Sequence, residues 1–117
     1  MNPYLDEQNN PHIKVEFFAP DRELADCLID TRFSGGLALP ERFHSKFKDP
    51  PIAYQEYELA DGSLTTFSIY RCKVKFKAII KEITLVFTNS SEGLMGREFL
   101  NGFKMVLDLK KYQITLE

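Results

Sequence analysis

The sequence contains no tryptophan and only two cysteines and two histidines. Cys27 and Cys72 lack the paired spacing of a zinc site, and one pair of thiols makes no disulfide framework, so we expect two buried, reduced cysteines. His12 and His44 stand in no metal-ligand or catalytic-triad pattern, and we assign them no chemistry. These shortages argue against a zinc module, a disulfide scaffold and a histidine-based triad.

An excess of charge and a long apolar run are missing as well. The chain has 15 Lys and Arg residues against 17 Asp and Glu residues, a net charge of −2, so nothing at whole-chain level recruits nucleic acid or an anionic membrane. No apolar run approaches the roughly 18 residues that a membrane span needs. Residues 1–12 lack the basic and apolar parts of a signal peptide. We expect a soluble, cytoplasmic protein without nucleic-acid or membrane partners.

Apolar residues are plentiful. They make up 44% of the 117 residues, and aromatic residues make up 13%, which suits one domain with a sizeable core. Residues 1–11 are polar and contain Pro3 and Pro11, so we expect a loose N-terminal arm. The single domain is expected over residues 12–117.

Alternating apolar and polar residues predict about seven strands in a mainly β, mostly antiparallel fold. Ile13, Val15 and Phe17, for example, point to one side of a strand, with charged residues between them. Two short helices are expected, over residues 40–47 and in the turn that Gly102 closes. The expected strands cover residues 12–17, 24–29, 52–59, 64–76, 83–87, 105–109 and 112–116.

The strand over residues 64–76 changes phase. Phe67 and Ile69 are its apolar positions at first, but Tyr70 and Cys72 are the apolar positions afterwards. A shift of one residue exchanges the two faces, so we expect a bulge or bend near residues 69–71. A hairpin with its tip away from the body and its base in the core would need such a change.

Three motifs occur in a fixed order. A strand ends in Asp30-Thr31 and continues into a Gly-rich turn and the apolar segment Leu37–Pro40. The hairpin tip Ala60–Gly62 follows, and then Leu94–Arg97 before a short helical turn. Asp30-Thr31 alone is compatible with an ordinary turn at a strand end. Together, however, the motifs resemble the single-domain, retropepsin-like aspartic peptidases of the small cellular type, over residues 12–117.

The resemblance implies a closed antiparallel β barrel with one or two short helices and a flap hairpin. It implies a homodimer acting on a peptide or protein substrate, with no metal and no cofactor. Asp30 would be the catalytic carboxylate, and Thr31 would hydrogen-bond across the interface. The remaining implied roles are substrate binding by Phe33, Ser34, Gly35, Asp61 and Gly62, a structural loop of Leu94, Met95, Gly96 and Arg97 beneath the active site, and an interface strand at residues 112–117.

The implied chemistry explains why each copy needs one aspartate. Two carboxylates about 3 Å apart cannot both ionise, so they share one proton. The ionised carboxylate takes a proton from an attacking water, and the protonated one donates to the peptide carbonyl.

Arg32 departs from the family pattern, which has glycine at this position, and we treat it as a possible modulator. A side chain there could obstruct substrate, and a backbone conformation reserved for glycine would add about 1–3 kcal/mol of strain. A guanidinium within roughly 4–6 Å of the Asp30 pair would lower the pKa of both carboxyls and remove the shared proton. Alternatively, Arg32 points away, and its backbone N–H still serves the carboxylate. In viral relatives the arginine that corresponds to Arg97 pairs with an acid just after the active-site triplet, but this chain has Phe33-Ser34-Gly35 there. Either the short helix is anchored differently, or Arg97 pairs with Glu98 or another acid.

Three functions remain open at this point. The first is an aspartic endopeptidase. The second is a catalytically impaired retropepsin-like fold that binds peptides or takes part in assembly, because of Arg32. The third is a small antiparallel β module whose likeness to the peptidases is superficial.

Overall fold

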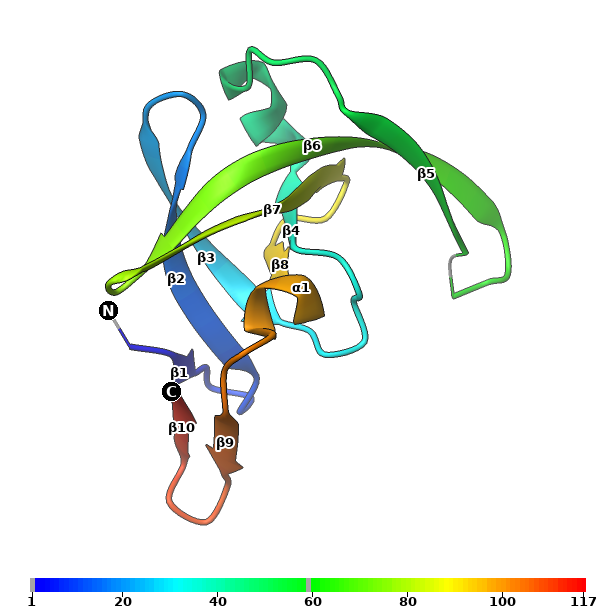
Figure 1. The fold of residues 1–117 in the computed structure, drawn as a ribbon. Coiled ribbons are helices and arrows are strands. Elements are labelled where there is room, and N and C mark those ends of the chain that lie inside the picture. The colour runs from blue at the N-terminus through cyan, green and yellow to red at the C-terminus, as the bar shows by residue number, and fades with distance from the viewer. Residues whose placement is uncertain (1, 59) are drawn as a thin grey trace.

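Six strands close into a barrel in the computed structural model, which describes residues 2–58 and 60–117. The barrel closes because β6 pairs with β7 on one side and with β2 on the other (Figure 1). In the order of pairing, the barrel strands are β2 (Pro11–Phe18), β3 (Arg22–Ile29), β8 (Gly93–Met95), β4 (Leu37–Pro40), β7 (Ile79–Thr88) and β6 (Leu64–Phe76).

The closed, mainly β barrel confirms the expected fold class, although its strand pairing is mixed and not wholly antiparallel. β3 pairs with β8 in parallel, and β4 pairs with β7 in parallel. The reason is that residues 30–36 form a loop between β3 and β4 instead of a tight hairpin, so that β8 lies between these two strands. Apolar periodicity shows which face of a strand is buried, but not the direction of its neighbour.

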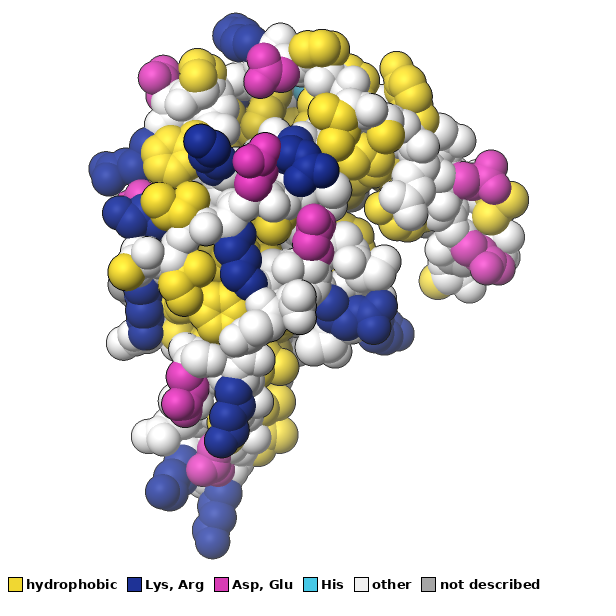
Figure 2. All heavy atoms as spheres, in the orientation of Figure 1, with side chains coloured by type: hydrophobic (Ala, Val, Ile, Leu, Met, Phe, Trp, Pro, Cys, Tyr) yellow, Lys and Arg dark blue, Asp and Glu magenta, His cyan; other side chains and the backbone are white. Residues whose placement is uncertain are grey.

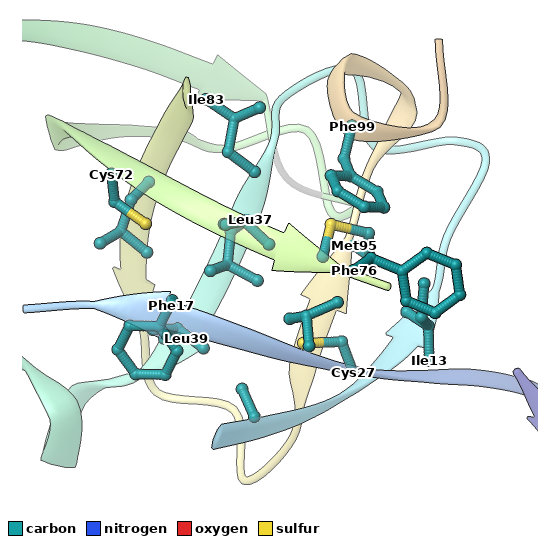
Figure 3. Packing of buried hydrophobic residues seen from close by; sticks show 14 of the residues in the cluster. Ile13, Phe17, Cys27, Leu37, Leu39, Cys72, Phe76, Ile83, Met95 and Phe99 are labelled. Atoms are coloured by element: carbon teal, nitrogen blue, oxygen red, sulfur yellow. The ribbon is translucent and has the colours of Figure 1, made fainter. Parts of the chain in front are cut away.

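The barrel interior is filled by side chains from every barrel strand. Ile13, Val15 and Phe17 are all 0% exposed, as their alternation in β2 predicted. Figure 3 shows these strands meeting around Leu37, Met95 and other labelled residues. Burying one large apolar side chain contributes roughly 1.5–3 kcal/mol, so this cluster is the main source of stability.

Cys27 and Cys72 belong to the same core, and both are free thiols, as expected. Burial raises the pKa of each thiol to about 12. They therefore remain protonated and pack as small apolar groups.

A hairpin arm extends from the barrel. It consists of β5 (Ala53–Glu58) and the first half of β6, and it arches over the loop between β3 and β4 (Figure 1). The expected strand extended to position 59, which lies outside the described residues. We call residues 53–69, apart from position 59, the arm.

The phase change in β6 coincides with a change of the strand that β6 pairs with. β6 pairs with β5 as far as Ile69 and with β7 from Tyr70, and neither register contains an inserted residue. Ile69 and Tyr70 are both buried, but they face opposite sides of the strand and join different apolar clusters. Of the two expected features, a bulge or a bend, the bulge is absent, because β6 keeps its register and changes the face that it buries.

Two short helices accompany the barrel. The first is a 3₁₀ helix, η1 (Glu41–Lys46), and Pro40 precedes it as the last residue of β4. Phe43 and Phe47 pack on Phe17, with ring centroids 5.7 and 6.1 Å away. The second is α1 (Arg97–Leu100), which ends before Gly102, a glycine with a positive φ of 91°.

The N-terminal segment is more ordered than the loose arm that we expected. β1 (Tyr4–Leu5) pairs with β2, and Pro3 is buried. β1 lies beside β10 (Gln113–Leu116), which pairs with β9 (Met105–Asp108) in a hairpin that projects from the barrel (Figure 1). The two ends of the chain thus meet on one side of the molecule.

Candidate active site

Asp30 follows β3 directly, and the loop fixes its carboxylate. The backbone N–H of Asp30 donates to the carbonyl of Met95 at 2.9 Å, which continues the pairing with β8. The carboxylate Oδ1 accepts the backbone N–H of Arg32 at 2.9 Å. The N–H of Phe33 donates to the carbonyl of Asp30 at 3.2 Å. Asp30 is half-buried, so the turn orients the carboxylate while leaving it accessible.

The segment after β8 lies directly beneath this loop. The N–H of Gly96 donates to the carbonyl of Gly36 at 2.8 Å, and the N–H of Arg97 donates to that of Phe33 at 2.9 Å. A Cβ atom on Gly96 would lie 2.2 Å from the carbonyl oxygen of Gly35. Only glycine allows the two backbones to approach so closely.

Glu98 completes the support of the loop. Its N–H donates to the carbonyl of Gly35 at 3.2 Å, and its carboxylate accepts both the N–H of Thr84, at 3.1 Å, and the Thr84 hydroxyl. The hydroxyl oxygen of Thr84 in turn accepts the N–H of Gly36 at 3.3 Å. Of the alternatives for Arg97, an ion pair with Glu98 or another acid is absent among the described residues; Glu98 binds Thr84, and the short helix is anchored differently.

A cleft of about 500 Å³ opens between the loop and the arm. Figure 2 shows the arm standing away from the barrel with a hollow beneath it. The walls are mostly apolar, and burial, together with the charge of Glu98, raises the pKa of the Tyr57 hydroxyl. The lining residues are Asp30, Arg32, Phe33, Ser34, Ala38, Tyr57, Glu58, Ala60, Phe67, Val86, Thr88 and Leu94.

The structure brings part of the expected site to this cleft. Asp30, Phe33, Ser34 and Leu94 line it, whereas Thr31 is exposed beside it. Gly35 faces the supporting segment beneath the loop.

Asp61 and Gly62 lie at the tip of the arm and do not line the cleft. The Asp61 carboxylate accepts the backbone N–H of Ser63 at 2.9 Å and its hydroxyl at 2.6 Å. Gly62 has a positive φ of 85°, as a tight hairpin requires. The two residues therefore shape the turn, and Glu58 and Ala60 provide the cleft-lining part of the tip.

Arg32 adopts a conformation that causes no backbone strain. Its φ is not positive, so the loop does not reserve this position for glycine, and the expected strain is absent. Its side chain is exposed and lines the cleft. Among the described residues, no ion pair joins its guanidinium to an acid, Asp30 included.

Several lining residues escaped the sequence analysis because they come from strands distant in the sequence. Tyr57 and Phe67 lie on the arm, and their rings meet edge to face at 5.4 Å. Val86 and Ala38 come from β7 and β4 and form a second apolar cluster with Ile69. The phase change in β6 was the signal that could have revealed this second cluster.

The described residues hold neither a cluster of metal ligands nor a helix that could span a membrane. They contain no cluster of three or more His, Cys, Asp and Glu side chains that could hold a metal ion. None of their helices is long and apolar enough to span a membrane.

Solved structures that are similar to this chain include aspartic proteases. A retropepsin-like aspartic protease from Rickettsia conorii is similar over 99% of this chain and 87% of its own, at a TM-score of 0.72 and 15% identity. EIAV protease in complex with the inhibitor HBY-793 matches over 87% of this chain and 97% of its own (TM-score 0.60, 17% identity). Simian foamy virus (mac) protease matches over 76% of this chain and 90% of its own (TM-score 0.57, 13% identity). No family model and no curated protein sequence matches the chain. The shared architecture shows that this chain has the fold of the retropepsin-like aspartic proteases.

Proposed function

We propose that the protein is a homodimeric aspartic endopeptidase in which Asp30 of each copy supplies one of two catalytic carboxylates. The observation that carries the proposal is the position of Asp30: it lies at the edge of an apolar cleft, and the N–H of Arg32 orients its carboxylate at 2.9 Å. A single carboxylate cannot be general acid and general base at once, so the reaction needs a second copy.

The catalytic cycle follows from the shared proton. The ionised Asp30 of one copy takes a proton from water as the water attacks the peptide carbonyl, and the protonated Asp30 of the other donates to the carbonyl oxygen. The arm acts as the flap in this proposal. It covers the substrate, excludes bulk water and strengthens the electrostatic interactions within the cleft.

The proposed dimer is supported by the hairpin of β9 and β10. Its two strands pair with each other, Ile114 and Leu116 face the core, and the apolar residues that remain exposed are Val106, Leu107, Leu109 and Tyr112. A second copy that covers this surface would remove apolar area from water, and each buried Å² contributes about 25 cal/mol.

Arg32 is compatible with catalysis in two respects. Its backbone N–H still reaches the Asp30 carboxylate, and among the residues that the structure describes its side chain forms no ion pair with that carboxylate. A second function is peptide binding without hydrolysis, and one observation favours it: Arg32 lines the same cleft as Asp30. In a dimer, two guanidinium groups near the pair would favour the doubly ionised form.

The test is cleavage of a broad peptide library between pH 3 and 8 by the unchanged protein, Asp30→Asn and Arg32→Gly, with sedimentation as a check of dimerisation. We expect cleavage by the unchanged protein and its loss, by at least about a thousandfold, in Asp30→Asn. Activity only in Arg32→Gly would establish the second function. Inactivity of all three folded, dimeric proteins would overturn the proposed peptidase.

A further inference from the structure

The cleft presents a cation on its loop wall and an anion on its arm wall. Arg32 lies on the loop wall near the Asp30 carboxylate, and Glu58 lies on the arm wall. Both side chains are exposed, and within residues 2–58 and 60–117 no ion pair involves either of them. Two charged groups of opposite sign therefore face one cleft while each lacks a charged partner.

The surroundings strengthen the asymmetry. The arm also carries Glu56 and Asp61, and the chain has no Lys or Arg between positions 49 and 70. Besides Asp30, Ser34 and Thr88, the rest of the lining is largely apolar, with Phe67 on the arm and Val86 on the barrel. An ionic contact made there is weakened less by solvent than one on an open surface.

The chemistry of each wall selects a different side chain. A guanidinium holds a carboxylate through two parallel hydrogen bonds, whereas a carboxylate attracts an ammonium or guanidinium group. In an extended peptide, neighbouring side chains point to opposite sides. An acid and a base at adjacent positions can thus reach the two walls at the same time.

We infer that the cleft selects extended peptides that carry an acidic side chain toward Arg32 and a basic side chain toward Glu58 at adjacent positions. The inference rests on the proposed function for the location of the substrate, and it names the substrate class. Apolar residues beside the charged pair occupy the middle of the cleft, against Phe67, Val86 and Leu94.

The test measures binding instead of cleavage, on the Asp30→Asn protein, so that it does not depend on turnover. The probes are fluorescent octapeptides with a central Phe-Leu and, beside it, Glu-Lys, Glu-Gln, Gln-Lys or Gln-Gln, with the pair placed in both orders. We expect each favourable charge to tighten binding about tenfold, as a charge-assisted hydrogen bond in a partly enclosed site does. Fluorescence anisotropy gives the dissociation constants.

A variant of each wall removes one charge and serves as the control for the variant of the other wall. Arg32→Gln should abolish the preference for Glu and leave the preference for Lys, and Glu58→Gln should do the reverse. Arg42→Gln removes the same charge outside the cleft, where Arg42 lies over the Phe43 ring at 4.8 Å, and both preferences should persist. Arg32→Glu should turn the preference for Glu into one for Lys on the loop side.

Three results would overturn the inference: equal binding of all four peptides, no binding of any, or a change in both preferences in either single variant. The last result would mean that Arg32 and Glu58 pair with each other when the arm closes. The proposed function is judged separately, by whether the unchanged protein cleaves peptides, so either idea can fail while the other stands.

Discussion

The loop that carries Asp30 and the N-terminal segment that precedes β2 both pack on the barrel, but different kinds of contact hold them in place. The loop is held by backbone hydrogen bonds from Gly96, Arg97 and Glu98, and by an approach so close that no Cβ atom fits at Gly96. The N-terminal segment pairs with β2 through β1 and is held in addition by side chains that titrate. The site geometry should therefore tolerate changes of pH that loosen the N-terminal segment.

His12 lies at the centre of the N-terminal attachment. It is 7% exposed, its Nε2 lies 2.8 Å from Oδ2 of Asp6, and its Nδ1 lies 3.1 Å from Oδ1 of Asp26. The Tyr4 ring stacks on it at a centroid distance of 4.9 Å, and the Tyr4 hydroxyl donates to Asp26. His12 belongs to no recognisable sequence motif, because its partners lie 6 and 14 positions away, and this role could not be predicted.

This geometry determines the protonation of the histidine. Carboxylates only accept hydrogen bonds, so both ring nitrogens of His12 must carry a proton to satisfy Asp6 and Asp26 together. Burial lowers the pKa of His12, but the hydrogen bonds and charges of the two carboxylates outweigh it and raise the pKa above its usual value of 6.5. The attachment is therefore strongest when His12 is charged.

Gly96→Ala should have the largest effect. A Cβ atom 2.2 Å from the carbonyl of Gly35 and 2.7 Å from that of Phe33 meets backbone, which cannot move aside cheaply. We expect a loss of about 3 kcal/mol in the free energy of unfolding, or a displaced loop, at every pH between 5 and 9. Urea denaturation measures the first, and peptide binding to the cleft measures the second.

Gly62→Ala is the matched control for this change. Position 62 has open space around it, and only its positive φ of 85° opposes a side chain. The cost should be about 1 kcal/mol and confined to the arm. Equal costs at Gly96 and Gly62 would mean that close packing does not fix the loop.

Glu98→Ala should have the next largest effect. It leaves the half-buried N–H and hydroxyl of Thr84 without their acceptor and removes the network that reaches Gly36. We expect a loss of about 2 kcal/mol in urea denaturation. Thr84→Val in the same background should cost little more, because the two residues act through one network. Additive losses would contradict the network.

The sequence predicted the barrel better than it predicted the cleft, and the reason is physical. The strands of the barrel bury one face, so the alternation of residues such as Ile13 and Val15 reveals them. The motif around Asp30 revealed the fold because its residues are contiguous. The pairing of β3 with β8, the cleft wall at Val86 and the partners of His12 depend on contacts between distant segments. Such contacts leave no local pattern.

His12→Gln should change the pH dependence of stability more than its size. Because the pKa of His12 is raised in the folded state, its contribution is complete below pH 6.5 and is lost as the pH rises through the folded-state pKa. The unchanged protein should therefore lose about 1 kcal/mol toward pH 9, a modest value because Asp6 and Asp26 are partly exposed. The variant should lack this slope.

The measurement is a series of urea denaturation curves between pH 5.5 and 9, with His44→Gln as the control. His44 bonds Glu41 at 2.8 Å and the Tyr70 hydroxyl at 2.9 Å, so it faces a single carboxylate. The slope should survive in His44→Gln. Its disappearance there, or its persistence in His12→Gln, would place the pH sensitivity outside the N-terminal attachment.

Tyr4→Phe should have the smallest effect on the free energy of unfolding, and it separates the contribution of Tyr4 from that of His12. The change keeps the ring that stacks on His12 and removes only the hydroxyl that donates to Asp26. We expect a loss of about 0.5–1 kcal/mol, the usual net value of one hydrogen bond. The hydrogen bond to Asp26, followed by burial, raises the pKa of Tyr4 to about 12, so the hydroxyl stays protonated up to pH 9 and the loss should be the same throughout. A loss that grows toward pH 9 would show that Tyr4 acts through the charge of His12. A constant loss would leave His12 as the source of the pH dependence in the N-terminal attachment.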